Sequence, residues 1–221
     1  MSMINLKSVS RIYNRSDKTV TALNGINFCV EKGEYVSVLG TSGSGKSTLM
    51  NVLGTLDRPD FGEYTIDGVN VGKMSNRELD RLRRNKIGFI FQRYCLVPSL
   101  TAFDNVELPL IYAKVPRAER IKRVSESLEK VGLIDRANHK PSELSGGQQQ
   151  RVAVARAIVT NPPIILADEP TGNLDPKTTE QIAEIFDKMH SVGKTIILIT
   201  HDNSVAKRAE RQVVINKGKI E

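Results

Sequence analysis

The 221-residue sequence contains no tryptophan, only two cysteines and no long apolar run. Its apolar runs reach about five residues, whereas a helix needs ~20 to cross a bilayer. Met1–Leu6 also lacks the charged-then-apolar layout of a signal peptide. We therefore expect the chain to stay in the cytosol. Cys29 and Cys95 lie far apart, without a C-x-x-C spacing or a nearby histidine, which predicts two buried free thiols.

The charge balance gives a basic chain, with a formal net charge of +7. Such a charge suits a nucleic acid or a membrane surface as partner. The basic residues gather in Arg77–Lys86 and Lys114–Arg123, but acids alternate with them and both segments have amphipathic helical spacing. No helix-turn-helix, zinc-finger or aromatic RNA-binding pattern accompanies them. We therefore expect no nucleic-acid partner, and interpret these segments as solvated helix faces or as a face near anionic lipid.

Short apolar segments rich in β-branched residues alternate with helical patterns along the chain. These segments have no polar face, which is typical of strands buried on both sides in a parallel sheet. The expected strands are Tyr35–Leu39, Ile87–Phe91, Ile164–Ala167, Thr195–Thr200 and Gln212–Asn216. The alternation predicts an α/β layered core, in which ligands bind at the carboxyl ends of the strands.

Other segments interrupt this alternation. The turn pair Asp67-Gly68 predicts a hairpin, and antiparallel strands are expected over Ile4–Val9, Val20–Leu23, Ile26–Val30 and Glu63–Val71. Three helices have clear start or stop residues. They are Ala102–Tyr112 after the cap Thr101, Arg117–Val131 between Pro116 and Gly132, and Lys177–His190 after the cap Asp175.

The segment Gly40–Ser47 matches the pattern G-x-x-x-x-G-K-[ST] between an expected strand and an expected helix. Its glycines let backbone N–H groups point at phosphate oxygens, and the helix dipole adds a positive end. Lys46 is expected to reach the β- and γ-phosphates of a nucleotide, and the Ser47 hydroxyl to bind Mg²⁺. The expected nucleotide-binding residues are Gly40, Thr41, Ser42, Gly43, Ser44, Gly45, Lys46, Ser47 and Thr48.

Polar side chains end three of the expected strands. Asp168 and Glu169 follow the strand Ile164–Ala167. We expect Asp168 beside Mg²⁺, and Glu169 one step further, polarising a water as general base. Gln92 and His201 end two further strands and can face the γ-phosphate, although either residue on its own is more often structural.

A second glycine-rich helix start lies about 100 residues downstream of the first, at Leu144-Ser145-Gly146-Gly147-Gln148. The segment that follows, Gln148–Val159, has apolar residues at helical spacing. Backbone N–H groups of the two glycines and the Ser145 hydroxyl make such a helix start suitable for an anion. A plain helix cap is the alternative interpretation, since no second nucleotide motif accompanies it.

Together these motifs resemble those of the ATP-binding-cassette (ABC) ATPases, over the full chain. In that family Ser145–Gln148 matches the signature that holds ATP bound to a second subunit, and Gln92 the Q-loop that joins Mg²⁺ to the helical lobe. His201 matches the switch histidine, Tyr13 the aromatic residue that stacks on adenine, and Asp175 ends the loop at the subunit contact. The resemblance assigns catalysis to Lys46, Gln92, Glu169 and His201, and metal binding to Ser47, Gln92 and Asp168.

The resemblance implies a P-loop ATPase fold with a mostly parallel, RecA-like core and a single domain over residues 1–221. Its expected lobes are antiparallel β over 1–34 and 60–75, nucleotide-binding core over 35–59, 76–92 and 150–221, and helical over 93–149. Within the family, the segments Asn105–Leu110, Asn138–Pro141 and Ala167–Asp175 are similar to the subgroup that serves lipoprotein release, macrolide-type export and antimicrobial-peptide resistance.

The resemblance also implies partners: a second copy of the chain when ATP binds, and a separate transmembrane permease. We accordingly expect a cytoplasmic protein held peripherally on the inner face of the membrane, hydrolysing ATP to drive export or extraction. A non-transport ATPase that controls cell-wall or cell-division proteins through a transmembrane partner would have the same motifs. Relatives acting in DNA repair or on ribosomes fit less well, because the glycine motifs are closely spaced and the chain has one cassette.

Overall fold

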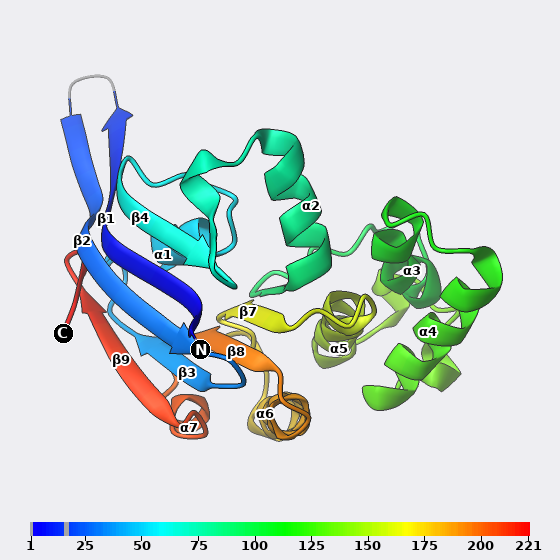
Figure 1. The fold of residues 1–221 in the computed structure, drawn as a ribbon. Coiled ribbons are helices and arrows are strands. Elements are labelled where there is room, and N and C mark those ends of the chain that lie inside the picture. The colour runs from blue at the N-terminus through cyan, green and yellow to red at the C-terminus, as the bar shows by residue number, and fades with distance from the viewer. Residues whose placement is uncertain (1, 16–17) are drawn as a thin grey trace.

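The computed structural model describes residues 2–15 and 18–221. Its larger sheet has the strand order β10-β9-β3-β8-β7-β6, in which β9 through β6 run parallel and β10 pairs antiparallel with β9 (Figure 1). The strands are β3 (Tyr35–Leu39), β6 (Ile87–Phe91), β7 (Ile164–Asp168), β8 (Thr195–Ile199), β9 (Arg211–Asn216) and β10 (Lys219–Ile220). The predicted parallel α/β core is therefore confirmed.

The parallel strands are apolar on both faces because each face packs against a separate core. Along β7, Ile164 and Leu166 belong to the core under the antiparallel sheet, whereas Ile165 and Ala167 belong to the core under the helices. All four side chains are fully buried. Because successive side chains of a strand point to opposite faces, β7 contributes apolar residues to both cores.

The smaller sheet is antiparallel, with the order β2-β1-β4-β5. Its strands are β1 (Ser2–Arg15), β2 (Lys18–Glu31), β4 (Phe61–Ile66) and β5 (Val69–Asn70). Ile66 pairs with Val69, so the predicted Asp67-Gly68 turn is confirmed. The separate N-terminal segments predicted from sequence are instead two long strands, whose pairing shifts register at several irregularities.

Helices cover the sheets and form a group at one end of the molecule (Figure 1). They are α1 (Lys46–Leu53), α2 (Asn76–Lys86), α3 (Ala102–Tyr112), α4 (Arg117–Lys130), α5 (Gly146–Ile158), α6 (Pro176–Ser191) and α7 (Asn203–Ala206). Short 3-10 turns span Val71–Lys73, Ile134–Arg136 and Pro141–Glu143. Both predicted caps are present: the Thr101 side chain accepts from the Asp104 N–H, and the Asp175 side chain from the Thr178 N–H.

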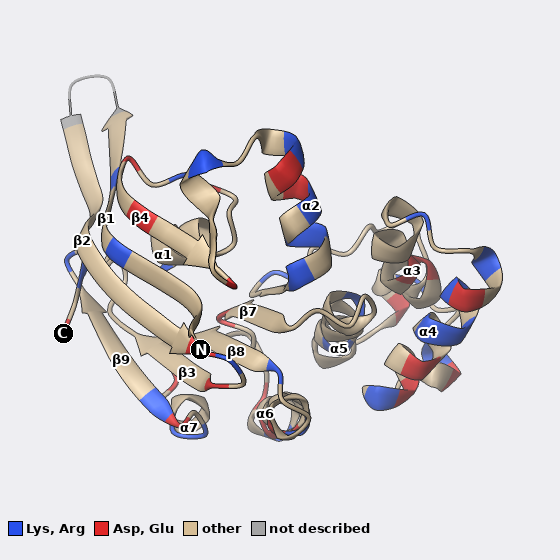
Figure 2. Ribbon diagram, viewed as in Figure 1, with Lys and Arg blue, Asp and Glu red and all other residues tan. Residues whose placement is uncertain are grey.

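Charged residues of both signs alternate on α2 and α4, as Figure 2 shows. Arg83 pairs with Asp80 on α2, and Arg123 with Glu119 on α4, where N–O is 2.7 Å. Exposed pairs of this kind contribute only a few tenths of a kcal/mol each. Within residues 2–15 and 18–221, no helix is both long and apolar enough to span a bilayer.

The prediction that both cysteines are buried is wrong. Cys29 and Cys95 are exposed free thiols. Cys29 lies between the buried residues Phe28 and Val30 of β2, so strand alternation directs it to the opposite face. Cys95 lies in the irregular segment after β6, with a positive φ of 50°.

Candidate nucleotide-binding site

A cavity of about 950 Å³ opens where the phosphate loop meets the carboxyl ends of the parallel strands. The wall contains every predicted residue from Gly40 to Thr48 except Ser44, together with Gln92, Asp168, Glu169 and His201. These side chains come from the loop between β3 and α1 and from the ends of β6, β7 and β8. The structure thus brings the phosphate loop and the four strand-end residues into one cavity.

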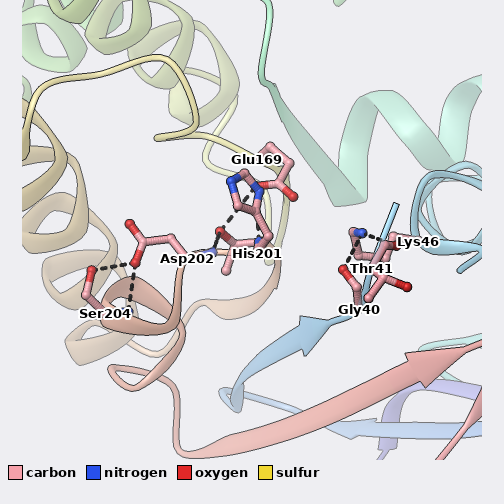
Figure 3. Close-up of polar contacts among 8 residues, drawn as sticks. Gly40, Thr41, Lys46, Glu169, His201, Asp202 and Ser204 are labelled. Carbon is pink, nitrogen blue, oxygen red and sulfur yellow. Dashed lines mark hydrogen bonds and ion pairs between the residues drawn. The ribbon is translucent and has the colours of Figure 1, made fainter. Parts of the chain in front are cut away.

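The phosphate loop is held in a tightly packed conformation. Gly45 precedes α1 with a φ of 109°, and a Cβ there would lie 2.7 Å from the carbonyl oxygen of Ala22, so only glycine fits. The Lys46 ammonium donates to the carbonyl oxygens of Gly40 (2.6 Å) and Thr41 (2.8 Å), as Figure 3 shows. These bonds fix the positive charge inside the loop, beside the N-terminus of α1.

Glu169 and His201 contact each other directly (Figure 3). His201 Nδ1 lies 2.8 Å from Glu169 Oε2, which also accepts bonds from the His201 N–H (3.2 Å) and the Thr200 hydroxyl (3.3 Å). Glu169 has a positive φ of 46° and its side chain is 12% exposed, whereas that of His201 is 66% exposed. A left-handed conformation in a non-glycine residue is strained, and such strain is concentrated at functional sites.

The turn after β8 positions the histidine. The Thr200 hydroxyl accepts from the Asp202 N–H (3.0 Å), and the Asp202 carboxylate accepts from the N–H and hydroxyl of Ser204 (Figure 3). Asp202 is the N-cap of α7. Backbone and side-chain bonds thus fix the residues on either side of His201, while its ring remains exposed.

Burial raises the pKa of Asp168 above its usual value, and the neighbouring Glu169 charge raises it further, while Lys46 opposes both effects. A carboxyl group whose pKa is raised on folding favours the folded state below the unfolded pKa. That contribution is lost as the pH rises through the folded pKa. Above its folded pKa the ionised Asp168 carboxylate therefore opposes folding, unless an opposing positive charge is present.

Asp168→Asn is accordingly expected to raise the melting temperature of the nucleotide-free protein at pH 7. Solvent screening keeps the gain at or below roughly 2–4 °C for a chain of this size. Thermal melts of both proteins between pH 4 and pH 8 would measure it. The two melting temperatures should converge at the acid end; a gain of equal size at pH 4 would contradict the assignment to ionisation.

The second glycine motif lies outside this cavity. Ser145 is the N-cap of α5: its hydroxyl oxygen accepts from the Gln148 N–H (3.3 Å), and Gln148 Oε1 accepts from the Ser145 N–H (2.9 Å). The helix begins at Gly146, two residues earlier than predicted, which leaves the N–H groups of both glycines in its first turn. Ser145 and Gly146 are exposed.

Three other predicted residues also lie outside the cavity wall. Tyr13 on β1 donates its hydroxyl to Asp57 Oδ2 (2.6 Å), and the Arg11 guanidinium lies 4.6 Å above its ring. Asp175 caps α6, and Ser44 is buried inside the phosphate loop. The structure therefore places Tyr13 and Asp175 in local structural contacts, and their contact with a nucleotide stays a prediction.

Sequence reasoning missed two parts of the wall. Val20, Thr21 and Ala22 of β2 line one side, and Lys217 and Gly218 of the β9–β10 turn line another. Neither segment matches a nucleotide motif. Hydrogen bonds between distant segments bring them there: Gly218 donates to the Ser44 carbonyl and accepts from the Asn24 N–H, each at 2.8 Å. The Lys-Gly pair directly after the last predicted strand, Gln212–Asn216, was the available signal.

A parallel core with a phosphate loop, a strand-end carboxylate pair and a separate glycine helix start defines a P-loop ATPase. A family model described as "ABC transporter" matches residues 23–172, more than half of the chain. The chain therefore belongs to the ABC transporter family. This membership confirms the predicted family, the fold and the identity of the chain as an ATP-binding, ATP-hydrolysing cassette.

Several relatives cover nearly the whole chain. An uncharacterized ABC transporter ATP-binding protein, YvrO of Bacillus subtilis, is 52% identical over 99% of this chain and 95% of its own length. The macrolide export ATP-binding/permease protein MacB of Hyphomonas neptunium is 51% identical over 99% of this chain, which spans 34% of that protein. The predicted similarity to an export subgroup is thus confirmed at the level of sequence.

Similarity to solved structures also indicates an ABC cassette fold. The cassette MJ0796, whose sequence is from Methanocaldococcus jannaschii, has been solved as a dimer in a post-hydrolysis state bound to ADP and Pi. It superposes with a TM-score of 0.93 at 47% identity, covering 99% of this chain and 97% of that one. At this similarity the two chains share one fold throughout.

Proposed function

We propose that two copies of this chain close head to tail around two ATP molecules and thereby drive a separate membrane permease. In this arrangement, the ATP held by one chain's phosphate loop is completed by Ser145–Gly147 of the other. The supporting observation is that this anion-ready helix start is exposed but lies outside its own chain's cavity. The solved dimer of MJ0796 with ADP and Pi supports the same arrangement.

Glu169 is proposed as the general base. Its carboxylate is nearly buried, lines the cavity and has its second oxygen available while Oε2 is bonded to His201 and Thr200. A carboxylate held in this way can orient an attacking water and accept its proton. His201 fixes that orientation through Nδ1, and its exposed ring can turn its other nitrogen toward the γ-phosphate. Gln92 would contact the γ-phosphate region when ATP is bound and lose that contact after hydrolysis, and the segment that follows Gln92 would shift with it.

The residues present fit a magnesium ion. Ser47, Gln92 and Asp168 line the same cavity and offer a hydroxyl, an amide oxygen and a carboxylate, and Mg²⁺ prefers such oxygen ligands together with substrate phosphates. The destabilised charge of Asp168 is what a cation would relieve. When bound, Mg²⁺ neutralises charge on the β- and γ-phosphates. We propose these three residues as its protein ligands, directly or through water.

Lys46→Ala is expected to lose most of the nucleotide affinity, because its ammonium is fixed inside the loop that surrounds the phosphates. Loss of a charge-assisted contact to phosphate corresponds to about 1.5–3 kcal/mol, or roughly 10- to 150-fold in Kd. Isothermal titration calorimetry with ATP would measure it. Lys73→Ala, on the distant turn Val71–Lys73, removes the same charge outside the cavity and serves as the control. Unchanged ATP affinity in Lys46→Ala would rule the role out.

The membrane partner follows from the relatives. MacB is named as an ATP-binding/permease protein, and this chain spans about a third (34%) of its length. We therefore propose peripheral attachment to the inner face of the membrane through a permease, in export or extraction of a lipoprotein, peptide or drug-like molecule. The irregular segment that follows Gln92 and the helices α3 and α4 are the proposed contact.

The test is to purify the tagged chain from native membranes, identify the membrane protein that accompanies it, and reconstitute the pair in vesicles. ATP-dependent movement or extraction of a solute would support transport. Hydrolysis that depends on the partner but moves no solute would instead favour the regulatory alternative. Both the transport and the regulatory function would be contradicted if no membrane protein co-purifies with the chain and no candidate partner changes its rate of ATP hydrolysis.

A further inference from the structure

The hairpin between β9 and β10 forms part of the wall of the ATP cavity. Asn216 pairs with Lys219, which leaves Lys217 and Gly218 as a two-residue turn. Both turn residues have positive φ, 45° and 74°. Two successive positive values define a type I′ turn, in which the first position favours asparagine, aspartate or glycine.

This turn is anchored to the nucleotide site itself. The Gly218 N–H donates to the carbonyl of Ser44 in the phosphate loop (2.8 Å), and the Gly218 carbonyl accepts from the Asn24 N–H (2.8 Å), two residues beyond the part of β2 that lines the cavity. Lys217 therefore has a fixed backbone position relative to the phosphate loop. Its side chain is exposed at the cavity wall.

Lysine is a costly choice at this position. A non-glycine, non-asparagine residue in the left-handed region is strained by about 1 kcal/mol or more. Within the part of the chain that the structure describes, no carboxylate forms an ion pair with Lys217. Because Lys217 lines the cavity and no described carboxylate pairs with it, its ammonium is available to a ligand there.

The charge of the cavity supports this interpretation. Its wall contains two lysines, Lys46 and Lys217, and two carboxylates, Asp168 and Glu169. Lys217 is the only lysine in the described cavity wall besides Lys46, so it can add a second side-chain positive charge where a polyphosphate enters beside two acids. We propose that Lys217 is a further nucleotide-binding residue, which stabilises the bound nucleotide through its ammonium and the polyphosphate charge. The proposal rests on ATP binding and requires neither dimerisation nor a membrane partner.

The test is calorimetric titration of Lys217→Asn with ADP in the presence of EDTA, which measures binding without hydrolysis. Asparagine suits the turn better than lysine, so the melting temperature should stay equal or rise. The Kd for ADP should nevertheless increase about three- to fivefold at low salt, as for one exposed charge pair. The increase should shrink at 0.5 M salt, where screening is strong.

Two variants separate charge from shape. Lys219→Asn removes the same charge from the same hairpin but outside the cavity wall, and should leave the Kd unchanged. Lys217→Arg keeps the charge and should bind ADP nearly as well as the unaltered chain. The proposal is overturned if Lys217→Asn binds ADP with unaltered affinity, or if Lys217→Arg and Lys219→Asn weaken binding as much as it does. The proposed dimer and permease would be unaffected by either result.

Discussion

Replacing Glu169 with glutamine is expected to preserve ATP binding and to slow hydrolysis by about 10²–10⁴-fold, which corresponds to roughly 3–5 kcal/mol of activation free energy. Glutamine has the same shape and can still accept from the His201 N–H through its amide oxygen. It cannot take a proton from water. Because ATP then persists, the variant should accumulate as an ATP-bound dimer, visible by size-exclusion chromatography with MgATP.

The matched control is Glu184→Gln, which makes the same chemical change on an exposed position of α6. It should hydrolyse ATP at the unaltered rate and elute as the unaltered chain does. A Glu169→Gln variant that turns over at the native rate would remove Glu169 from the role of base. A variant that is slow but stays monomeric with ATP would count against the dimer instead.

Ser145→Arg should likewise leave the ATP affinity of the single chain unchanged and reduce hydrolysis by at least about 10²-fold. Ser145 is exposed and lies outside its own cavity, so its replacement leaves the phosphate loop intact. In the proposed dimer, however, the arginine side chain would occupy the space of the partner's γ-phosphate. Removal of one donor to a reacting oxyanion is by itself worth about 10²–10³ in rate.

Loss of the helix cap needs its own control, because Ser145 also caps α5. Ser75→Ala removes the equivalent capping box from α2, where the Ser75 hydroxyl oxygen accepts from the Glu78 N–H. Each change costs about 0.5–2 kcal/mol of stability. Only Ser145→Arg should lose hydrolysis; equal loss in both variants, or weakened ATP binding by Ser145→Arg, would contradict the two-chain site.

The core of the fold was predictable because its signals are local. β3 and β6 have the bounds predicted from the sequence, and β7 and β9 differ by one residue. Their apolar, β-branched segments are too short to be helices and have no polar face. The long N-terminal strands were harder to predict. Their register irregularities interrupt the alternation of side chains, and a hairpin is then indistinguishable from several short strands.

The site was predictable where a motif carries it and not where long-range packing does. The phosphate loop and the strand ends bear residues whose chemistry is specific to phosphate and metal. No motif identifies the two other parts of the wall, Val20–Ala22 and Lys217-Gly218. Hydrogen bonds from Gly218 to Ser44 and from Asn24 to Gly218 hold these segments at the cavity. The buried-thiol prediction failed for Cys29 because burial there depends on which face of β2 is solvated, and for Cys95 because that residue lies in an irregular segment.

The contact between the starts of α5 and α6 has a consequence for timing. A Cβ on Gly147 would lie 2.3 Å from Thr178 Cγ2, and Thr178 also donates its N–H to the cap Asp175 (3.1 Å). The first turns of α5 and α6 are therefore packed together at Gly147 with no room for an added side chain, and Asp175 lies six residues beyond Glu169. In the proposed dimer, this packing would link the cavity that loses phosphate to the helix start that binds the partner's nucleotide. Hydrolysis at the two sites would then be coupled, so that the state of one site affects the rate at the other.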